Sequence, residues 1–395
     1  MTGKRLANKG RQSHAVLTIN GRVALWRRWW YAEPTGSVAP LDDVLDRHGA
    51  TVTHGVRELA CRENQSSVSF DKAAENLARS AQLKMSGEQL RLNVEAEGRQ
   101  VLAAQQRATI DTAWTAEDCG LESGPTRIYA GCDGVMVPTI TDAEKQKRRE
   151  KVKQKRRPRG RKSRPLPTRK RGTDQPWKEF KVVYFYSEDM QHQHVAVTPH
   201  NHEAAGHLMR READRLQFRQ ADERVANIDG APWIREQMQE HLAELDGLGL
   251  DFYHLSENVH RGRRAVFGEE SAEGRTWADE LMHTFKHEGH DAAWQRLMQW
   301  RGTVGRSPRK RKAADRLLHY VAERREMIRY PAFCARGWQI GSGPTESQCK
   351  LTVSRLKGHG RRWDRPNAAA VAALDSLDRS GQWQNYWETP LDDAA

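Results

Sequence analysis

Three acidic residues lie at positions in predicted strands and a predicted helix where their carboxylates could bind metal ions. Asp133 lies inside the apolar run RIYAGCDGVMVPT, which predicts a buried strand, and an uncompensated charge is costly there. Asp229 ends a second strand-like run, RVANIDGAPWI, and Glu346 lies near the start of a helix predicted from GSGPTESQCKLTVSRLKG. If the two strands are neighbours, their carboxylates meet at one end of the sheet and repel each other unless a cation lies between them. Hard carboxylate oxygens favour Mg²⁺ or Mn²⁺.

Such a carboxylate set suits phosphodiester chemistry. Two metal ions held ~3.5–4 Å apart would activate a water or a 3′-hydroxyl and stabilise the leaving oxygen. Each residue also has a structural interpretation, because Asp229-Gly230 is a common turn dipeptide and Glu346 could be a helix-capping acid behind Pro344. Asp133 has few structural uses inside a strand. The joint placement of the three, on two strands and on a helix that follows an insertion, favours function.

The elements around these residues predict an α/β fold with a mixed sheet. After the Asp133 strand, the runs FKVVYFYSED and HQHVAVTPHN predict an antiparallel meander. A helix (EAAGHLMRREADRLQFRQ), the Asp229 strand, a second helix (IREQMQEHLAEL) and a strand-like run (LGLDFYHL) follow. From about 268 to 331 the period is purely helical, with a break at 306–309, which predicts a helical insertion.

The N-terminal part predicts a hairpin and then helices. Asn20-Gly21 between the arms of SHAVLTINGRVALWRRWWYA is a strong hairpin signal. The tryptophans of the second arm could stack on bases, but the pattern favours a core role for Trp26, Trp29 and Trp30.

Two helices are predicted from FDKAAENLARSAQ and LKMSGEQLRLNVEAEGRQVL, the second with Ser86 as its N-cap. Their spacing suits either a DNA-binding helix–turn–helix or an ordinary helical hairpin. The predicted regions are a hairpin and helical region with a DNA-binding role at 1–120, a first core part at 125–265 with a basic loop at 145–171, a helical insertion at 266–335, and a C-terminal core part at 336–395.

The positive charge is concentrated in one segment. The net charge is +13, and the stretch from Lys145 to Arg171 holds 16 Lys and Arg residues against one acid, Glu150. The positive charges of such a segment repel one another, and a polyanion would neutralise them, so the segment predicts contact with nucleic acid. A solubilising linker or a localisation tract is the alternative interpretation.

The composition narrows the class of protein further. Mean hydropathy is −0.86, no apolar stretch approaches the roughly 20 residues of a membrane span, and MTGKRLANKGRQSH lacks a signal-peptide apolar region. A cytoplasmic, nucleoid-associated protein without a membrane partner is therefore expected. The five cysteines are scattered and form no CxxC pair, which argues against a disulfide framework and a zinc ribbon.

Four blocks, GCDGVMVPT, NIDGAPWI, LDFYHL and GSGPTESQCK, together resemble the ISKra-type insertion-sequence transposases of the DDE superfamily. The resemblance covers about residues 40–388 and includes the terminal QWQNYW. It implies an RNase H-like fold, with an all-helical domain inserted between the second aspartate and the glutamate. Position by position, it carries the catalytic and metal-binding roles over to Asp133, Asp229 and Glu346, with two Mg²⁺ (or Mn²⁺) ions. A cysteine pair that the family often carries near WWYAEPTGSVAPLD is absent, which puts a zinc-stabilised N-terminal module in doubt.

The resemblance also implies a reaction and its DNA contacts. A transposase of a bacterial insertion sequence nicks the element ends, joins the freed 3′-hydroxyls to target DNA, and acts as a homo-oligomer that brings two ends together. The DFYH string resembles the C/D-x-x-H element of related transposases, so Asp251 and His254 are expected to position the DNA. From the basic segment and the Glu346 helix with the residues just after it, the cations expected to face phosphates are Lys147, Arg148, Arg149, Lys155, Arg156, Arg157, Lys350, Arg355, Lys357, Arg361 and Arg362.

Two other functions fit the same residues. An RNase H-like nuclease or resolvase would cut DNA with these carboxylates without joining it. A catalytically inactive transposase relic would bind DNA through the basic segment without a divalent metal, and its affinity would fall steeply with salt.

Overall fold

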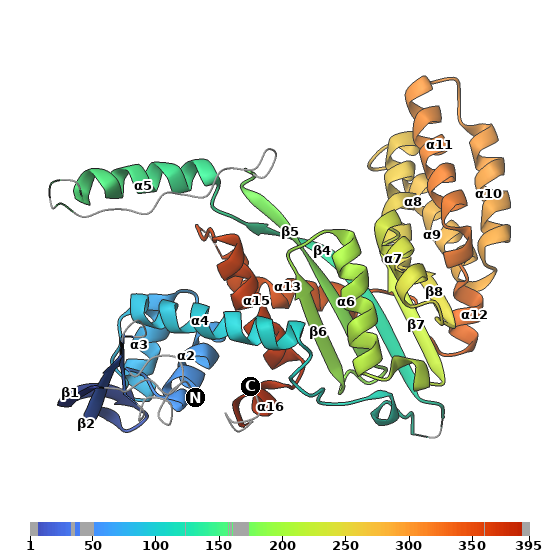
Figure 1. Ribbon diagram of the computed structural model, residues 1–395. Coiled ribbons are helices and arrows are strands. Elements are labelled where there is room, and N and C mark those ends of the chain that lie inside the picture. Colours follow the sequence, from blue (N-terminus) through green and yellow to red (C-terminus); the bar gives the residue numbers. More distant parts are fainter. Residues whose placement is uncertain are drawn as a thin grey trace.

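A five-stranded mixed sheet forms the centre of the molecule (Figure 1). The computed structural model describes residues 7–32, 36–39, 51–122, 124–156, 158, 160, 174–358 and 360–388. The strands are β4 (Arg127–Pro138), β5 (Trp177–Ser187), β6 (Gln193–Thr198), β7 (Glu223–Ile228) and β8 (Gly247–Leu250). Their order is β6-β5-β4-β7-β8, with β4, β5 and β6 antiparallel in sequence and β7 and β8 parallel to β4. This order confirms the predicted RNase H-like mixed sheet.

Both faces of this sheet are covered, which explains why its strands read as nearly continuous apolar runs. One face carries Ile128, Ala130 and Cys132 and packs on α6 (His202–Arg215) and α7 (Pro232–His241). The other face carries Tyr129 and Val135. It is covered by the C-terminal helices α13 (Gly343–Thr352), α14 (Ser354–Lys357) and α15 (Arg365–Arg379). Asp133 alternates with Tyr129 and Val135, so it belongs to this second face.

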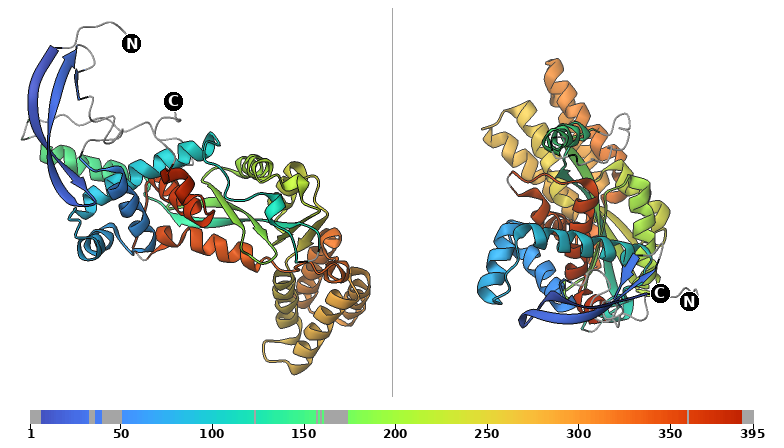
Figure 2. Two further views of the ribbon diagram at one scale, coloured as in Figure 1. Left: turned by 90° about the horizontal axis from the view of Figure 1, so that it is seen from below. Right: turned by 60° about the vertical axis from the view of Figure 1, so that its left-hand side comes forward.

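The predicted helical insertion lies between β8 and α13 and forms a separate bundle at one end of the molecule (Figures 1 and 2). Its helices are α8 (Phe252–Phe267), α9 (Ala272–His287), α10 (His290–Thr303), α11 (Pro308–Glu323) and the short α12 (Tyr330–Ala335). The predicted break near 306 is confirmed, since α10 ends at Thr303 and α11 begins at Pro308. None of the helices in the described part of the chain is long and apolar enough to cross a membrane.

The strand predicted through LGLDFYHL is half wrong. Strand β8 ends at Leu250, and α8 begins at Phe252. Asp251 is the N-cap of α8, and its side chain accepts a hydrogen bond from the backbone N–H of His254. A capping aspartate after an apolar run therefore turned the chain into a helix where the apolar pattern alone favoured a longer strand.

The N-terminal helices pack against the C-terminal ones. They are α2 (His54–Ser66), α3 (Phe70–Ser80) and α4 (Gly87–Gln106), and Ser86 caps α4 as predicted by accepting from the N–H of Gln89. The helix α4 lies along α15, and a Cβ on Gly98 would approach the carbonyl oxygen of Ala370 to 2.3 Å. Glycine is thus needed for this close approach. The chain ends, as far as it is described, with α16 (Trp383–Glu388).

The predicted hairpin is present, but its tryptophans do not form a core. The strands β1 (Ala7–Thr18) and β2 (Gly21–Ala32) pair antiparallel, and β3 (Gly36–Val38) joins the far end of β2. Trp26 is 69% exposed, and Trp29 and Trp30 are only partly buried. The predicted core role of these tryptophans is therefore wrong for Trp26. The apolar anchor is at the turn end, where Val16 and Leu17 are buried.

The basic segment starts as a helix and not as a loop. The helix α5 (Asp142–Arg156) follows β4 and projects from the body of the molecule (Figure 1). Lys, Arg, Gln and Glu favour helix, and Thr141 and Glu144 cap its start reciprocally: each backbone N–H donates to the other side chain. Arg157 and the stretch 161–173 lie outside the described residues.

Candidate active site

The register of the parallel strands aligns three aspartates. The strands β4 and β7 pair up to Ala130 and Ala226, and continuing that register by three residues matches Asp133 with Asp229, which directly follows β7. The strands β7 and β8 pair up to Ile228 and Leu250, so Asp229 is in turn level with Asp251. The three carboxylates thus follow one row across the sheet. Parallel strands make this possible because their carboxyl ends lie at the same edge.

A missing side chain lets the Glu346 helix reach this row. A Cβ on Gly131 would lie 1.9 Å from the hydroxyl oxygen of Thr345, so only glycine allows α13 to approach β4 this closely. Glu346 follows Thr345 and is exposed, with half of its side chain accessible. The helix α13 therefore presents Glu346 beside the strand that carries Asp133.

The turn after β7 is shaped around Asp229. Its carboxylate Oδ1 accepts a hydrogen bond from the N–H of Ala231 at 2.8 Å. Gly230 has φ +85°, a conformation that favours glycine, and its carbonyl accepts a hydrogen bond from Arg324 of the insertion at 2.8 Å. The insertion therefore contacts the backbone of the turn that holds Asp229.

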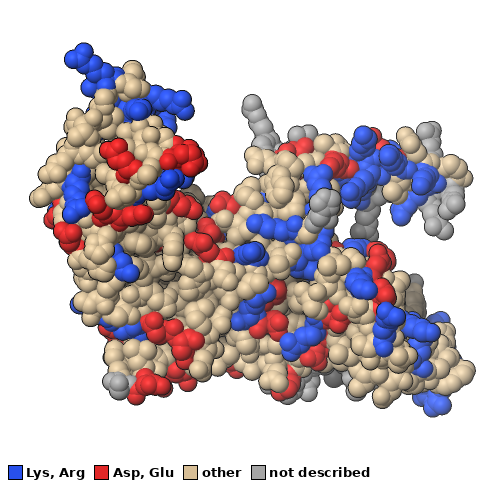
Figure 3. Space-filling view, turned by 180° about the vertical axis from the view of Figure 1, so that it is seen from behind, with Lys and Arg blue, Asp and Glu red and all other residues tan. Residues whose placement is uncertain are grey.

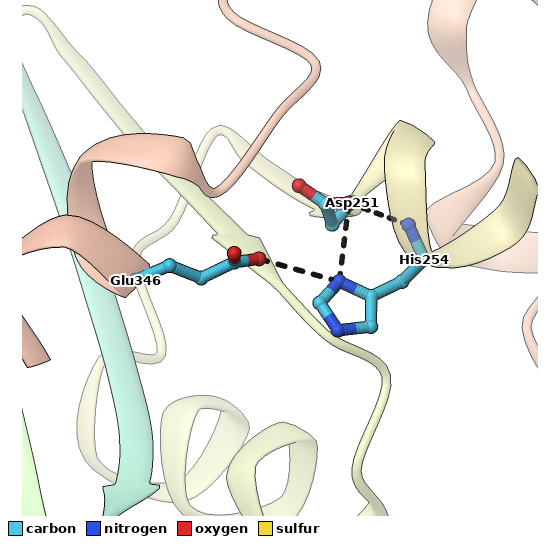
Figure 4. Close-up of side chains that lie close together, drawn as sticks. All are labelled: Asp251, His254 and Glu346. Atoms are coloured by element: carbon cyan, nitrogen blue, oxygen red, sulfur yellow. Dashed lines mark hydrogen bonds and ion pairs between the residues drawn. The ribbon is translucent and has the colours of Figure 1, made fainter. Parts of the chain in front are cut away.

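His254 lies between two carboxylates (Figure 4). Its Nδ1 lies 3.2 Å from Oδ1 of Asp251 and 3.5 Å from Oε1 of Glu346. Asp251 is fully buried, and its second oxygen accepts a hydrogen bond from the N–H of Ser342. The hydroxyl of Ser342 donates to Oε1 of Glu346 at 3.0 Å. Asp251 thus connects the start of α8 to the start of α13.

The pKa values of Asp133 and Asp251 are shifted in opposite directions. Burial, with the negative charges of Asp229 and Glu346, raises the pKa of Asp133 to about 6, although the N–H of Gly134 and the charge of His254 act to lower it. Burial also acts to raise the pKa of Asp251, but hydrogen bonds from His254 and Ser342 outweigh it and hold that pKa below its ordinary value. The hydrogen bond to Asp251 raises the pKa of His254 to about 9, so this imidazole is charged at neutral pH.

The predicted site residues are brought to one end of the sheet, but not all equally close. Asp251, His254 and Glu346 place a ligand atom each within 4.8 Å of one another, the kind of group that could hold a metal ion. Asp133 and Asp229 lie outside that group. Among the described residues, neither of these two aspartates forms an ion pair with Lys, Arg or His at 4 Å or less.

The geometry separates Asp251 from His254 by exposure and adds one residue that was not predicted. Asp251 is fully buried and its oxygens are occupied by His254 and Ser342, so it cannot contact DNA directly and instead positions His254. Ser342 was not predicted, although its place before Gly343-Pro344 at a helix start is typical of a capping residue.

The predicted phosphate-facing cations divide into exposed and buried ones. Figure 3 shows the positive side chains of α5 on the projecting arm, and the exposed members of the predicted set are Lys147, Arg148, Lys155, Arg156, Lys350, Lys357 and Arg362. Arg149 is half-buried. Arg362 bonds to Glu144 and to the carbonyl of Thr139, which ties α5 to the C-terminal part.

Arg355 is a core residue, contrary to its predicted role. It is 4% exposed, its guanidinium donates to the backbone and side-chain oxygens of Asn64, and it lies over the rings of Phe70 and Trp363. Burial lowers its pKa to about 10. Arg361 is half-buried and donates to the carbonyl of Arg355. Trp338 is buried, as expected of a packing residue.

Comparison with known proteins finds a likeness among solved structures. No protein-family model matches the chain, and no curated protein matches it. Among solved structures the chain is similar to one described as "Drosophila P element transposase strand transfer complex". The two are 10% identical, the match covers 87% of this chain and 82% of that one, and the TM-score is 0.30. The function is therefore argued from the residues of the site.

Proposed function

We propose that this protein is a metal-dependent DNA transposase whose active site consists of Asp133, Asp229 and Glu346. The observation that carries the proposal is the row of carboxylates on β4 and β7, with Glu346 presented beside it and no Lys or Arg paired to any of the three within the described chain. Within the described chain Asp133 and Asp229 are half-buried without an ion-pair partner and lie close to a third acid, Glu346, and such a set indicates a cationic ligand.

The donor set fits divalent magnesium or manganese. All three residues offer hard carboxylate oxygens, and the raised pKa of Asp133 reflects burial and mutual repulsion that a cation would relieve. Asp133, Asp229 and Glu346 would hold two ions, which when bound activate a water or 3′-hydroxyl and stabilise the leaving oxygen.

The chain's own groups then orient the reactants. Ser342 fixes one oxygen of Glu346 through its hydroxyl. Asp251 fixes the ring of His254 beside Glu346, so that this side chain, about a third of which is accessible, can contact the DNA backbone. The cations of α5, with Lys350 and Lys357, would hold flanking phosphates.

The sequence blocks around these residues support a finer assignment. Their resemblance to ISKra-type elements supports a transposase of a bacterial insertion sequence, which nicks the element ends and joins them to target DNA. Such a protein acts near the nucleoid and as a homo-oligomer, because two ends must be brought together.

The test is cleavage and joining of labelled DNA that carries the element boundary, with Mg²⁺ or Mn²⁺. We expect Asp133→Ala, Asp229→Ala and Glu346→Ala each to abolish cleavage while DNA binding persists, because the phosphate contacts lie elsewhere. Glu240→Ala, which removes an exposed acid of α7, is the matched control and should cut like the wild type. Cleavage by any of the three site variants at the wild-type rate would refute the assignment. Cut but unjoined products would indicate a nuclease.

A further inference from the structure

The hairpin of β1 and β2 carries an exposed face that the catalytic site does not use. Residues two apart on a strand share a face, and the cross-strand pairs Arg11–Arg28, Ser13–Trp26 and Ala15–Ala24 place six side chains on one side. All six are exposed. We call this set the ribbon face: Arg11, Ser13, Ala15, Ala24, Trp26 and Arg28.

The charge on this hairpin is of one sign. Residues 7–32 contain five Lys and Arg residues and no Asp or Glu. Arg11 and Arg28 stand directly opposite each other, a like-charge arrangement that destabilises a two-stranded ribbon. Within the described residues neither arginine forms an ion pair. An anionic partner would turn this repulsion into a favourable contact.

The exposed apolar surface of Trp26 is also unfavourable in water, and a bound partner would cover it. It is 69% exposed, although a tryptophan can bury a large apolar area. Its neighbours on the ribbon face are small or short, namely Ser13, Ala15 and Ala24, so they leave the ring standing above the strands. The apolar anchoring of the hairpin comes from its turn end, where Leu17 is hydrogen-bonded and bridged to the segment 51–53.

The shape of the hairpin selects the partner. Each strand has 12 residues, or about 40 Å of extended chain, which is comparable to one turn of B-DNA at ~34 Å. The major groove accepts a two-stranded ribbon. The hairpin also stands at the same end of the molecule as α5, away from the insertion (Figures 1 and 2). A duplex that follows α5 therefore has a second cationic element nearby.

We propose that the ribbon face binds duplex DNA in the major groove, with Arg11 and Arg28 on phosphates or base edges and Trp26 as an apolar contact. This inference deepens the proposed transposase function and rests on it for its biological meaning. The binding itself needs neither the carboxylates nor a metal ion.

The experiment measures binding by the full-length protein in EDTA, with a labelled duplex of about three helical turns, ~30 base pairs, and a single strand of the same length. Arg11→Ala/Arg28→Ala should weaken duplex binding and reduce the slope of log K against log salt by about 2, because two phosphate contacts are lost. Trp26→Ala should weaken binding about tenfold without changing that slope. Arg309→Ala/Arg316→Ala, two exposed cations of α11, is the charge-matched control and should bind like the wild type.

Unchanged affinity and slope in the double ribbon variant would overturn the proposal, as would tighter binding of the single strand than of the duplex. Thermal melting of each variant checks folding, and an exposed face predicts unchanged midpoints. The outcome is independent of catalysis. If the wild type cuts DNA and the ribbon variants bind like it, the ribbon proposal fails alone. If the wild type never cuts but the ribbon variants bind weakly, the transposase proposal fails alone.

Discussion

Two carboxylates on opposite faces of the central sheet, Glu212 buried and Asp133 half-buried, have opposite surroundings. Glu212 lies on α6 and is 2% exposed, and His194 of β6 and two arginines of α6 surround it. Asp133 lies on the other face, and its nearest charged neighbours include two further carboxylates. One acid is compensated by the protein and the other is not.

The compensation of Glu212 is complete. Its oxygens accept hydrogen bonds from Arg211 at 2.5 Å and from Arg215 at 2.6 Å, and the ring Nε2 of His194 lies 3.0 Å away. Burial acts to raise the pKa of Glu212, but these three partners outweigh it and lower the pKa to about 2. Burial of Asp133 is opposed only by the N–H of Gly134 and the charge of His254, which do not outweigh it, and its pKa rises to about 6.

Under the proposed function, the difference distinguishes a carboxylate that stabilises the fold from one that binds a ligand. Both are acids in a covered sheet, so burial alone does not mark the functional one. What marks Asp133 is the absence of a paired cation within the described chain, together with a second and third acid at the same end of the sheet.

Removal of the charge of Glu212 should give the largest effect on stability. Glu212→Gln leaves two arginines without their counter-ion, and we expect a loss of about 3–5 kcal/mol in the free energy of unfolding. The stabilisation is present above the unfolded pKa near 4.5 and is lost as pH falls towards 2, so the difference between wild type and variant should shrink over that range. Urea unfolding at several pH values measures it. Glu203→Gln, an exposed acid of the same helix, is the control. A loss of stability as small as that of the control would show that Glu212 does not stabilise the fold.

Asp133→Asn should change stability in the opposite direction. The folded pKa of Asp133 is raised to about 6, so the metal-free wild type should lose stability as pH rises from about 4 to 6, by roughly 3 kcal/mol. The asparagine variant lacks this loss and should be the more stable protein at pH 7. Melting in EDTA across this pH range tests it, and added Mg²⁺ should stabilise only the wild type appreciably. A variant less stable than wild type at pH 7 would show that Asp133 is compensated after all.

The smallest expected effect is that of the positioning serine. Ser342→Ala removes the hydrogen bond to Glu346 and keeps the backbone contact to Asp251, so cleavage should fall about tenfold. The apparent affinity for Mn²⁺ should fall with it, while the melting temperature stays near that of wild type. Ser342→Thr keeps the hydroxyl and should restore both values. Rescue of neither would mean that Ser342 serves only the fold.

Much of the fold follows from periodicity and local signals. Four of the five predicted strands of the sheet were confirmed at their places and the fifth in its first half, because apolar runs bounded by turns are typical of covered strands. The helices after 268 and the cap at Ser86 were equally clear. The basic segment was misjudged because its charge density outweighed the helix preference of its Lys, Arg and Glu residues.

The candidate carboxylates could be proposed from the sequence, but Ser342 could not. Asp133 and Asp229 break apolar runs, so they stand out. Ser342 does not, because its contact to Asp251 joins positions 91 residues apart. Glu212 lies in a helix rich in both charges, where an acid is ordinary until His194 is brought beside it by the sheet. Arg355 was misplaced for the same reason, since Asn64 is remote in sequence.

The two oxygens of Asp251 hold together the start and the end of the helical insertion. One of its oxygens holds the first turn of α8, the other holds Ser342, and the N–H of Phe252 donates to the carbonyl of Ile340. The two ends of the segment 252–341 therefore lie next to each other, and Asp251 connects them. Chain closed in this way is a side branch, and a doubling of its length adds only about 0.6 kcal/mol to the cost of closure. A lineage could lengthen or shorten the helical bundle while the carboxylates keep their places, provided that His254 and the contact of Arg324 to Gly230 are retained.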